Sequence, residues 1–222
     1  MNGKKLVFYL VWLGLLSLGP IAILKNTPLE LLSDNRAVVV NFIQRILGLA
    51  AFTMLFVQII LGSFMQKWIE KLGPWVLNFH IREGLLAYVL VILHPLLFVL
   101  FNYFIYGVLD PFYVFVDICV LCKPPIEYFY SLGRLSFWLI TAAVLAALFR
   151  TSTPFMRLHW KKFHALNYLT FLLIGIHSIG VGADVGTPPF SFFHGPALAV
   201  VLIIIVFKEL PALFKSIQKS HS

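Results

Sequence analysis

The stretch VLNFHIREGLLAYVLVILHPLLFVLFNYFIY, residues 76–106, decides how the chain folds. Its only charged residues are Arg82 and Glu83, which are neighbours in the sequence. A helix needs about 20 apolar residues to cross a bilayer. The stretch is longer than that, so it predicts a spanning helix that must tilt, bend or protrude. Pro95 lacks a backbone N–H and is expected to bend this helix.

The whole chain has the composition of a membrane protein. Hydrophobic residues make up 60% of its 222 residues and charged residues 12%, which is about half of the roughly 25% found in soluble domains. This excludes a soluble globular domain, a disordered tail and a coiled coil. The net charge of +8 does not indicate a nucleic-acid partner, because the basic residues are scattered between apolar blocks.

Five further apolar runs meet the same length requirement. The six expected spans are residues 6–24, 40–64, 76–106, 132–149, 163–181 and 196–214. We therefore expect an all-α membrane protein, a six-helix bundle forming one domain over residues 1–222. The first run follows Lys4 and Lys5 as in a secretory signal, but its length and the lack of a small-x-small cleavage site favour a retained helix.

The basic residues predict the orientation. If the N-terminus lies inside, only five of the 17 basic residues fall on the outer side. These five are Lys25, Arg36, Arg45, Lys123 and Arg134. The positive-inside rule then predicts a multi-pass protein of the plasma (inner) membrane with both termini cytoplasmic and one long outer connection, between the third and fourth spans.

Four histidines fall within two of the expected spans, where ionisable residues are rare and usually functional. His80 and His94 lie in the third span, His164 and His177 in the fifth. Both spans run from inside to outside. The steps of 14 and 13 residues correspond to about 21 and 19.5 Å along a helix. Two such helices side by side would present two facing histidine pairs, stacked along the membrane normal.

The direction of the side chains around each helix is a further test. At about 100° per residue, His80 and His94 lie about 40° apart, effectively on one face. His164 and His177 lie about 140° apart on a straight helix. The fifth helix must therefore be distorted, or its two histidines must be approached from different sides. Gly175 is a position where a local irregularity is possible.

Two facing imidazole pairs suit two haems, because each haem iron takes an axial histidine from either face. A zinc site is less favoured, since the two pairs are too far apart to share a metal with bonds of about 2.0 Å. The simpler alternative is that each histidine forms a hydrogen bond between helices. We expect His159, His194 and His221 to be interfacial or solvated.

Two segments carry a resemblance to a known family. Phe79-His80-Ile81-Arg82-Glu83-Gly84-Leu85-Leu86, running on to Leu93-His94-Pro95, resembles the third helix of the ferric reductase-like transmembrane domain. Leu158-His159-Trp160-Lys161-Lys162-Phe163-His164-Ala165-Leu166-Asn167-Tyr168, running on to Ile176-His177, resembles its fifth. The superfamily includes ferric reductases, NADPH oxidases and the haem-binding membrane subunit of the periplasmic methionine-sulfoxide reductase system.

The resemblance covers nearly all six spans and implies an oxidoreductase membrane component with two b-type haems between helices three and five. It places the axial ligands on His80 and His164 for the inner haem iron, and on His94 and His177 for the outer. Electrons would pass from a cytoplasmic flavin or NAD(P)H donor to ferric iron, dioxygen or a periplasmic reductase subunit. Many family members continue into FAD and nicotinamide domains, but no glycine-rich dinucleotide fingerprint occurs in these residues. A separate flavin reductase or flavin domain is therefore the expected partner.

Basic residues near the ends of the spans are candidates for haem propionates, which are anions. Arg45 and Arg134 could serve the outer haem. On the inner side the candidates are Arg82, Arg157, Lys161 and Lys162, which also suit a purely topological role or the docking of a cytoplasmic donor. Cys119 and Cys122 lie in the long outer connection, where they form either a local disulfide or two idle thiols.

A function of a different class stays open. The chain could be a membrane transporter or a structural bundle in which the histidines relay protons or join helices. Glu83 is the only acidic residue at a plausible depth, whereas proton paths often use several.

Overall fold

The computed structural model describes residues 3–33 and 35–211, and this part of the chain is all-α. The α-helices are α1 Gly3–Asn26, α2 Arg36–Ser63, α3 Met65–Leu72, α4 Trp75–Tyr106, α5 Pro111–Val116, α6 Ile126–Leu148, α7 Pro154–His164, α8 Leu166–Val181 and α9 Ser191–Ile204. Two short 3-10 turns, η1 Leu29–Leu32 and η2 Ala183–Gly186, and a π-helical segment, η3 Ile205–Glu209, complete the description.

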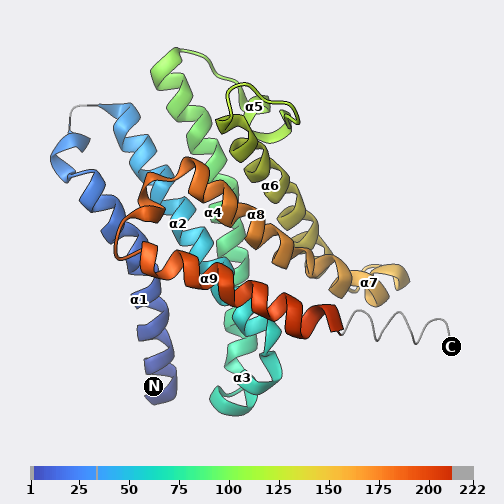
Figure 1. Cartoon of the computed structure of the whole chain (residues 1–222). Coiled ribbons are helices and arrows are strands. Elements are labelled where there is room, and N and C mark those ends of the chain that lie inside the picture. Colours follow the sequence, from blue (N-terminus) through green and yellow to red (C-terminus); the bar gives the residue numbers. More distant parts are fainter. Residues whose placement is uncertain (1–2, 34, 212–222) are drawn as a thin grey trace.

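Six stretches of helix are long and apolar enough to cross a membrane. They are α1, α2, α4, α6, the joined α7 and α8 (Pro154–Val181), and the joined α9 and η3 (Ser191–Glu209). Figure 1 shows α1, α2, α4 and α6 running side by side through the molecule, with the short α3 and α5 at opposite ends. The expectation of six long apolar helices is confirmed.

Three helices of membrane length begin well before the expected spans: the fifth begins at Pro154 and not near residue 163, and α6 and α9 also begin early. α6 begins at Ile126 and not near residue 132, because Ser131 and Arg134 are buried against the outer connection and hold the first turns in place. α9 begins at Ser191 and not at residue 196, because the preceding Phe190 is fully buried in the core. The end of the sixth expected span, residues 212–214, lies outside the described residues.

The fifth helix of membrane length is distorted. This is the first of the two alternatives that the directions of His164 and His177 around the helix left open. α7 ends at His164, Ala165 forms a turn, and α8 starts at Leu166. Gly175 is not the place of the irregularity, because α8 is regular around it. A Cβ on Gly175 would come within 2.2 Å of Leu198, so this glycine permits the close approach of α8 and α9. α4, in contrast, continues as helix through Pro95.

The helices pair in a way that leaves space between two of them. α4 packs mainly along α2, and α8 packs mainly along α6, whereas α4 and α8 make little direct contact. The main apolar core lies where α2, α8 and α9 meet, with the rings of Phe52 and Phe171 4.7 Å apart between their centroids. This core holds together two helix pairs that face each other across a gap.

Phe171 provides a test of the core. It is fully buried, so Phe171→Ala leaves a cavity and is expected to lower the free energy of unfolding by about 3 kcal/mol. Phe192→Ala, on a side chain that is 75% exposed toward the expected lipid, is the matched control and should change it little. The measurement is unfolding in detergent micelles followed by tryptophan fluorescence. Equal effects of the two substitutions would contradict the position of this core.

Candidate functional site

The rings of His80 and His164 meet from different helices, with their planes nearly perpendicular. His80 projects from α4 and His164 is the last residue of α7, and their ring centroids are 6.4 Å apart with planes at 80°. Two metal–nitrogen bonds of about 2.0 Å put the ligating nitrogens about 4 Å apart, with each ring centre roughly 1 Å further back. The observed separation therefore fits one metal ion held between the two rings.

His94 and His177 line one cavity of about 530 Å³. Its wall includes residues of α2, α4, α6 and α8, among them Gly48 and Phe52 of α2, Gly133 of α6 and Val181 of α8. This volume lies within the range of sites that enclose cofactor-sized ligands. The chain thus brings all four predicted histidines together in the two predicted pairs, one at a close contact and one at a cavity.

Three of these rings are oriented by backbone carbonyl groups. Nδ1 of His94 donates to the carbonyl of Gln44 at 2.9 Å, and Nδ1 of His177 donates to that of Phe129 at 2.7 Å. His164 makes a longer contact, 3.4 Å, with the carbonyl of Ala143. A carbonyl only accepts, so in His94 and His177 the proton is on Nδ1 and the lone pair of Nε2 is left for a metal. Metal-ligating histidines are usually held by a second contact of this kind.

The accepting carbonyls repeat with the spacing of the histidines. Phe129 and Ala143 are 14 residues apart on α6. On α2 the carbonyl of Gln44 accepts from His94, whereas Nδ1 of His80 is buried without a hydrogen-bond partner. α6 therefore provides acceptors for His164 and His177, and α2 provides one for His94.

The sequence analysis missed three glycines that face these rings. A Cβ on Gly48 would lie 2.8 Å from the ring of His94, and one on Gly133 would lie 2.8 Å from that of His177. A Cβ on Gly62 would lie 3.5 Å from the ring of His80, which is a less crowded contact. Gly48 and Gly62 are separated by 14 residues, as are His80 and His94. This shared spacing in two neighbouring spans is the signal that could have found them.

Arg45 lines the large cavity, but its guanidinium is already paired. Nε donates to Asp184 at 2.6 Å and Nη2 donates to the other carboxylate oxygen at 2.5 Å, while Nη1 donates to Thr27 at 2.8 Å. Asn26 also donates to Asp184, at 2.8 Å. This network joins the outer ends of α1 and α2 to η2.

Arg134 also lines the cavity and is buried. It donates to the carbonyl of Asp117 at 2.5 Å and to Glu127 at 3.3 Å, and its guanidinium lies 4.4 Å from the ring centroid of Tyr113. Burial raises the pKa of Tyr113 to about 12, and the hydrogen bond that its hydroxyl donates to the carboxylate of Glu127 acts in the same direction. Tyr113 consequently stays a hydrogen-bond donor at physiological pH. Arg45 and Arg134 thus both line the cavity, and each has a carboxylate partner that the sequence did not reveal.

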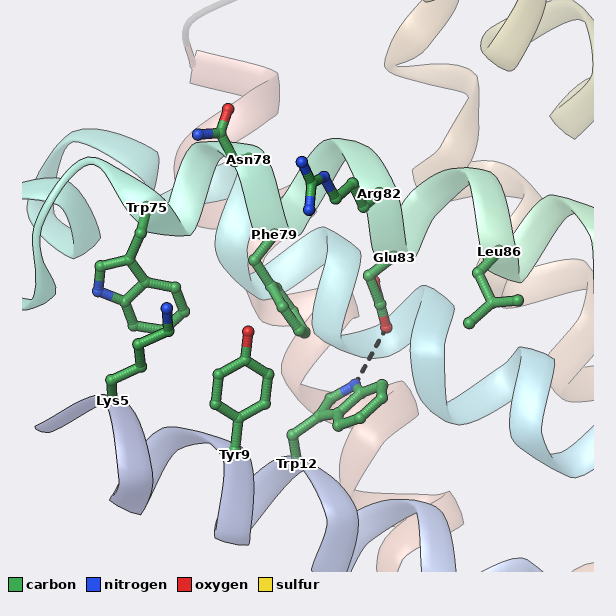
Figure 2. Close-up of a pocket in the computed structure, with 9 residues that line it drawn as sticks. All are labelled: Lys5, Tyr9, Trp12, Trp75, Asn78, Phe79, Arg82, Glu83 and Leu86. Atoms are coloured by element: carbon green, nitrogen blue, oxygen red, sulfur yellow. Dashed lines mark hydrogen bonds between the residues drawn. The ribbon is translucent and has the colours of Figure 1, made fainter. Parts of the chain in front are cut away.

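A second cavity, of about 390 Å³, lies between α1 and α4. Figure 2 shows Tyr9 and Trp12 of α1 facing Phe79 and Glu83 of α4. The buried carboxylate of Glu83 accepts a hydrogen bond from Nε1 of Trp12 at 3.3 Å and another from Gln58. This carboxylate therefore joins α1, α2 and α4 one helical turn from His80.

The inner basic candidates lie outside the close histidine contact. Arg82 is exposed and lines the second cavity together with Lys5. Arg157 is exposed on α7, and so are Lys161 and Lys162, with Lys161 lying 5.9 Å from the ring centroid of Trp160.

The predictions for the remaining histidines and for the cysteines are confirmed only in part. The expectation for His194 is wrong: it is buried in α9, where Nε2 contacts the hydroxyl of Ser178 at 2.8 Å and the ring stacks on Phe52 at 4.8 Å. His159 stacks on Phe155 at the surface, and His221 lies outside the described residues. Cys119 and Cys122 form a disulfide, the first of the two alternatives. Over residues 3–33 and 35–211, no three His, Cys, Asp or Glu residues gather as a metal cluster.

No protein-family model, curated protein or solved structure matches this chain.

The Arg45 network yields a stability prediction. Arg45→Gln leaves the carboxylate of Asp184, which is 2% exposed, without its cation and should lower the free energy of unfolding by about 3 kcal/mol. Arg36→Gln, on an exposed arginine of the same helix, is the control. The double variant Arg45→Gln/Asp184→Asn should recover most of the loss in the same micellar unfolding assay. If Arg45→Gln lowers the free energy of unfolding no more than Arg36→Gln does, the network does not stabilise the junction of α1, α2 and η2.

Proposed function

We propose that the protein is a di-haem b-type electron conduit that carries electrons across a membrane. In this proposal His80 and His164 hold the inner haem iron, and His94 and His177 hold the outer. The bound haems supply one-electron reduction and oxidation, and the protein supplies ligation, spacing and an apolar surrounding. The observation that carries the proposal is the pairing of four half-buried imidazoles, three of which turn Nδ1 toward a backbone carbonyl.

The fit to haem rests on the residues themselves. The gap between α4 and α8 is wide enough for a cavity at the outer pair, and Gly48 of α2 and Gly133 of α6 leave room for its two imidazole rings. Only Nε2 remains for a ligand on His94 and His177, as an axial imidazole requires. The resemblance to the ferric reductase-like transmembrane domain adds the same assignment of ligands. A bundle joined only by histidine hydrogen bonds would need no cavity of this size.

The direction of transfer follows from the charge distribution. The positive-inside rule puts both termini, and the end of the bundle with His80 and His164, on the cytoplasmic side of an inner membrane. At that end lies the second cavity, between α1 and α4, with aromatic walls and with Lys5 and Arg82 among its lining residues (Figure 2). A reduced flavin, free or on a flavin reductase, suits this surface as donor because its ring is flat and its phosphate anionic. Electrons would leave on the outer side to ferric iron, dioxygen or a periplasmic reductase subunit.

The first test is the haem itself. Protein purified under haem-replete expression should show low-spin b-type bands in a reduced-minus-oxidised spectrum, and pyridine haemochrome should give two haems per chain. Two are expected because both histidine pairs are complete. A colourless protein would end this proposal and favour the transporter or structural bundle. A ratio that stays at one would mean that one pair is not a haem site.

The glycines provide a second test. Gly48→Ala and Gly133→Ala each put a methyl group about 2.8 Å from an outer imidazole, and should lower the haem-to-protein ratio from two toward one. Gly14→Ala, in α1, meets no atom within 4 Å and is the matched control, expected to retain both haems. Retention of two haems in Gly48→Ala and Gly133→Ala would show that these helix faces do not border a haem.

A further inference from the structure

The long outer connection carries a feature that electron transfer to the outer side leaves unused. Cys119-Val120-Leu121-Cys122 lies between α5 and α6, and its cysteines form a disulfide with their Cα atoms 5.6 Å apart. Two cysteines separated by two residues are the arrangement found in many proteins that exchange thiols and disulfides. A purely structural link over three residues closes only a very short loop, so it adds little to the order of the outer connection.

The disulfide loop is fixed to the helix that walls the outer cavity. The N–H of Cys119 donates to the hydroxyl of Ser131 at 2.9 Å, and Arg134 donates to the carbonyl of Asp117 at 2.5 Å. Ser131 is two residues from Gly133, which faces the ring of His177, and Arg134 lines the cavity directly. The disulfide loop is thus bonded to the first turns of α6, the helix that also contributes Gly133 and Arg134 to the cavity wall. Figure 1 shows this loop beside α5, at the end of α6.

The two residues between the cysteines form an apolar tip. Val120 is 78% exposed and Leu121 is 90% exposed, whereas Cys122 is buried. Exposed apolar side chains on an aqueous surface are typical of a contact with another protein. Lys123 follows Cys122 directly in the sequence, and Arg134 donates to the carbonyl of Asp117, two residues before Cys119. Partial exposure of Cys119 with burial of Cys122 suits an attacking and a resolving thiol, respectively.

We propose that the Cys119–Cys122 disulfide is the acceptor of electrons from the outer haem and passes them to a disulfide of an extracytoplasmic protein. The proposal rests on the proposed function, which supplies the reductant. Two electrons, delivered singly, and two protons from the outer aqueous phase break the S–S bond and give two thiols. The thiolate of Cys119 then attacks the partner's disulfide, one partner sulfur leaves as a thiolate, and the attack of Cys122 on the mixed disulfide releases the reduced partner and restores the bond.

Thiol trapping in oriented vesicles tests this step. Reduced flavin is supplied at the cytoplasmic face, the sample is quenched in acid, and free thiols are labelled with a maleimide of high mass. Wild-type protein should gain two labelled thiols per chain after haem reduction and none before it. His80→Ala and His94→Ala should each reduce the labelling at least tenfold, whereas His159→Ala, at an exposed histidine on α7, should label like the wild type.

An aromatic disulfide reagent, added only outside, serves as a defined substrate. Its reduction should fall at least tenfold in Cys119→Ser and in Cys122→Ser, while the haems of both variants are still reduced from inside. Haems that become reduced while Cys119 and Cys122 stay unlabelled would overturn this inference and leave the proposed function standing. A protein without haem would overturn both. A membrane-impermeant phosphine, which reduces the disulfide directly, verifies that the cysteines can be labelled.

Discussion

The structure depends on how a buried imidazole satisfies its two ring nitrogens. A polar group inside a bundle of apolar helices costs several kcal/mol unless it finds a partner. Four histidines lie in that position here, and a neutral ring must both donate and accept. Backbone carbonyls take the donor side for His94 and His177, with a longer contact for His164. The acceptor side then points into the space between the helix pairs, where a bound metal would satisfy it.

This constraint accounts for the unusual pairing of the helices. α2 and α6 must lie against the histidine-bearing helices closely enough to lend them carbonyls, and glycine is the residue that permits such an approach. The histidine-bearing helices in turn stay apart. The turn at Ala165 separates the segment that carries His164 from the one that carries His177. Each ring can therefore reach its own carbonyl on α6, which one straight helix would not allow for both.

Much of this arrangement could be predicted from the sequence, because apolar length and helical spacing are local properties. The six long helices follow from composition, and the pairing of His80 with His164 and of His94 with His177 follows from matched steps along two helices. The roles of Asp184 and Glu127 could not be predicted, since Asp184 pairs with Arg45, 139 residues away in the sequence, and Glu127 pairs with Arg134, 7 residues along α6. His194 was misjudged because flanking Gly195 and Pro196 resemble a loop, whereas Phe190 draws the start of α9 into the core. The position of the turn at Ala165 is set by packing around His164 and has no marker such as glycine or proline.

The central claim is a relay from the inner to the outer histidine pair, and oriented vesicles test it most directly. Reduced flavin is supplied to one face at a time, and haem reduction is followed by absorbance. Replacing His94 should remove the outer haem and leave the inner haem reducible from the cytoplasmic face. Replacing His80 should leave the outer haem present but much more slowly reduced, because the two sites lie about 20 Å apart along the helix axis. If His80→Ala and His94→Ala behave alike, or if wild-type reduction is faster from the outer face, the relay is contradicted.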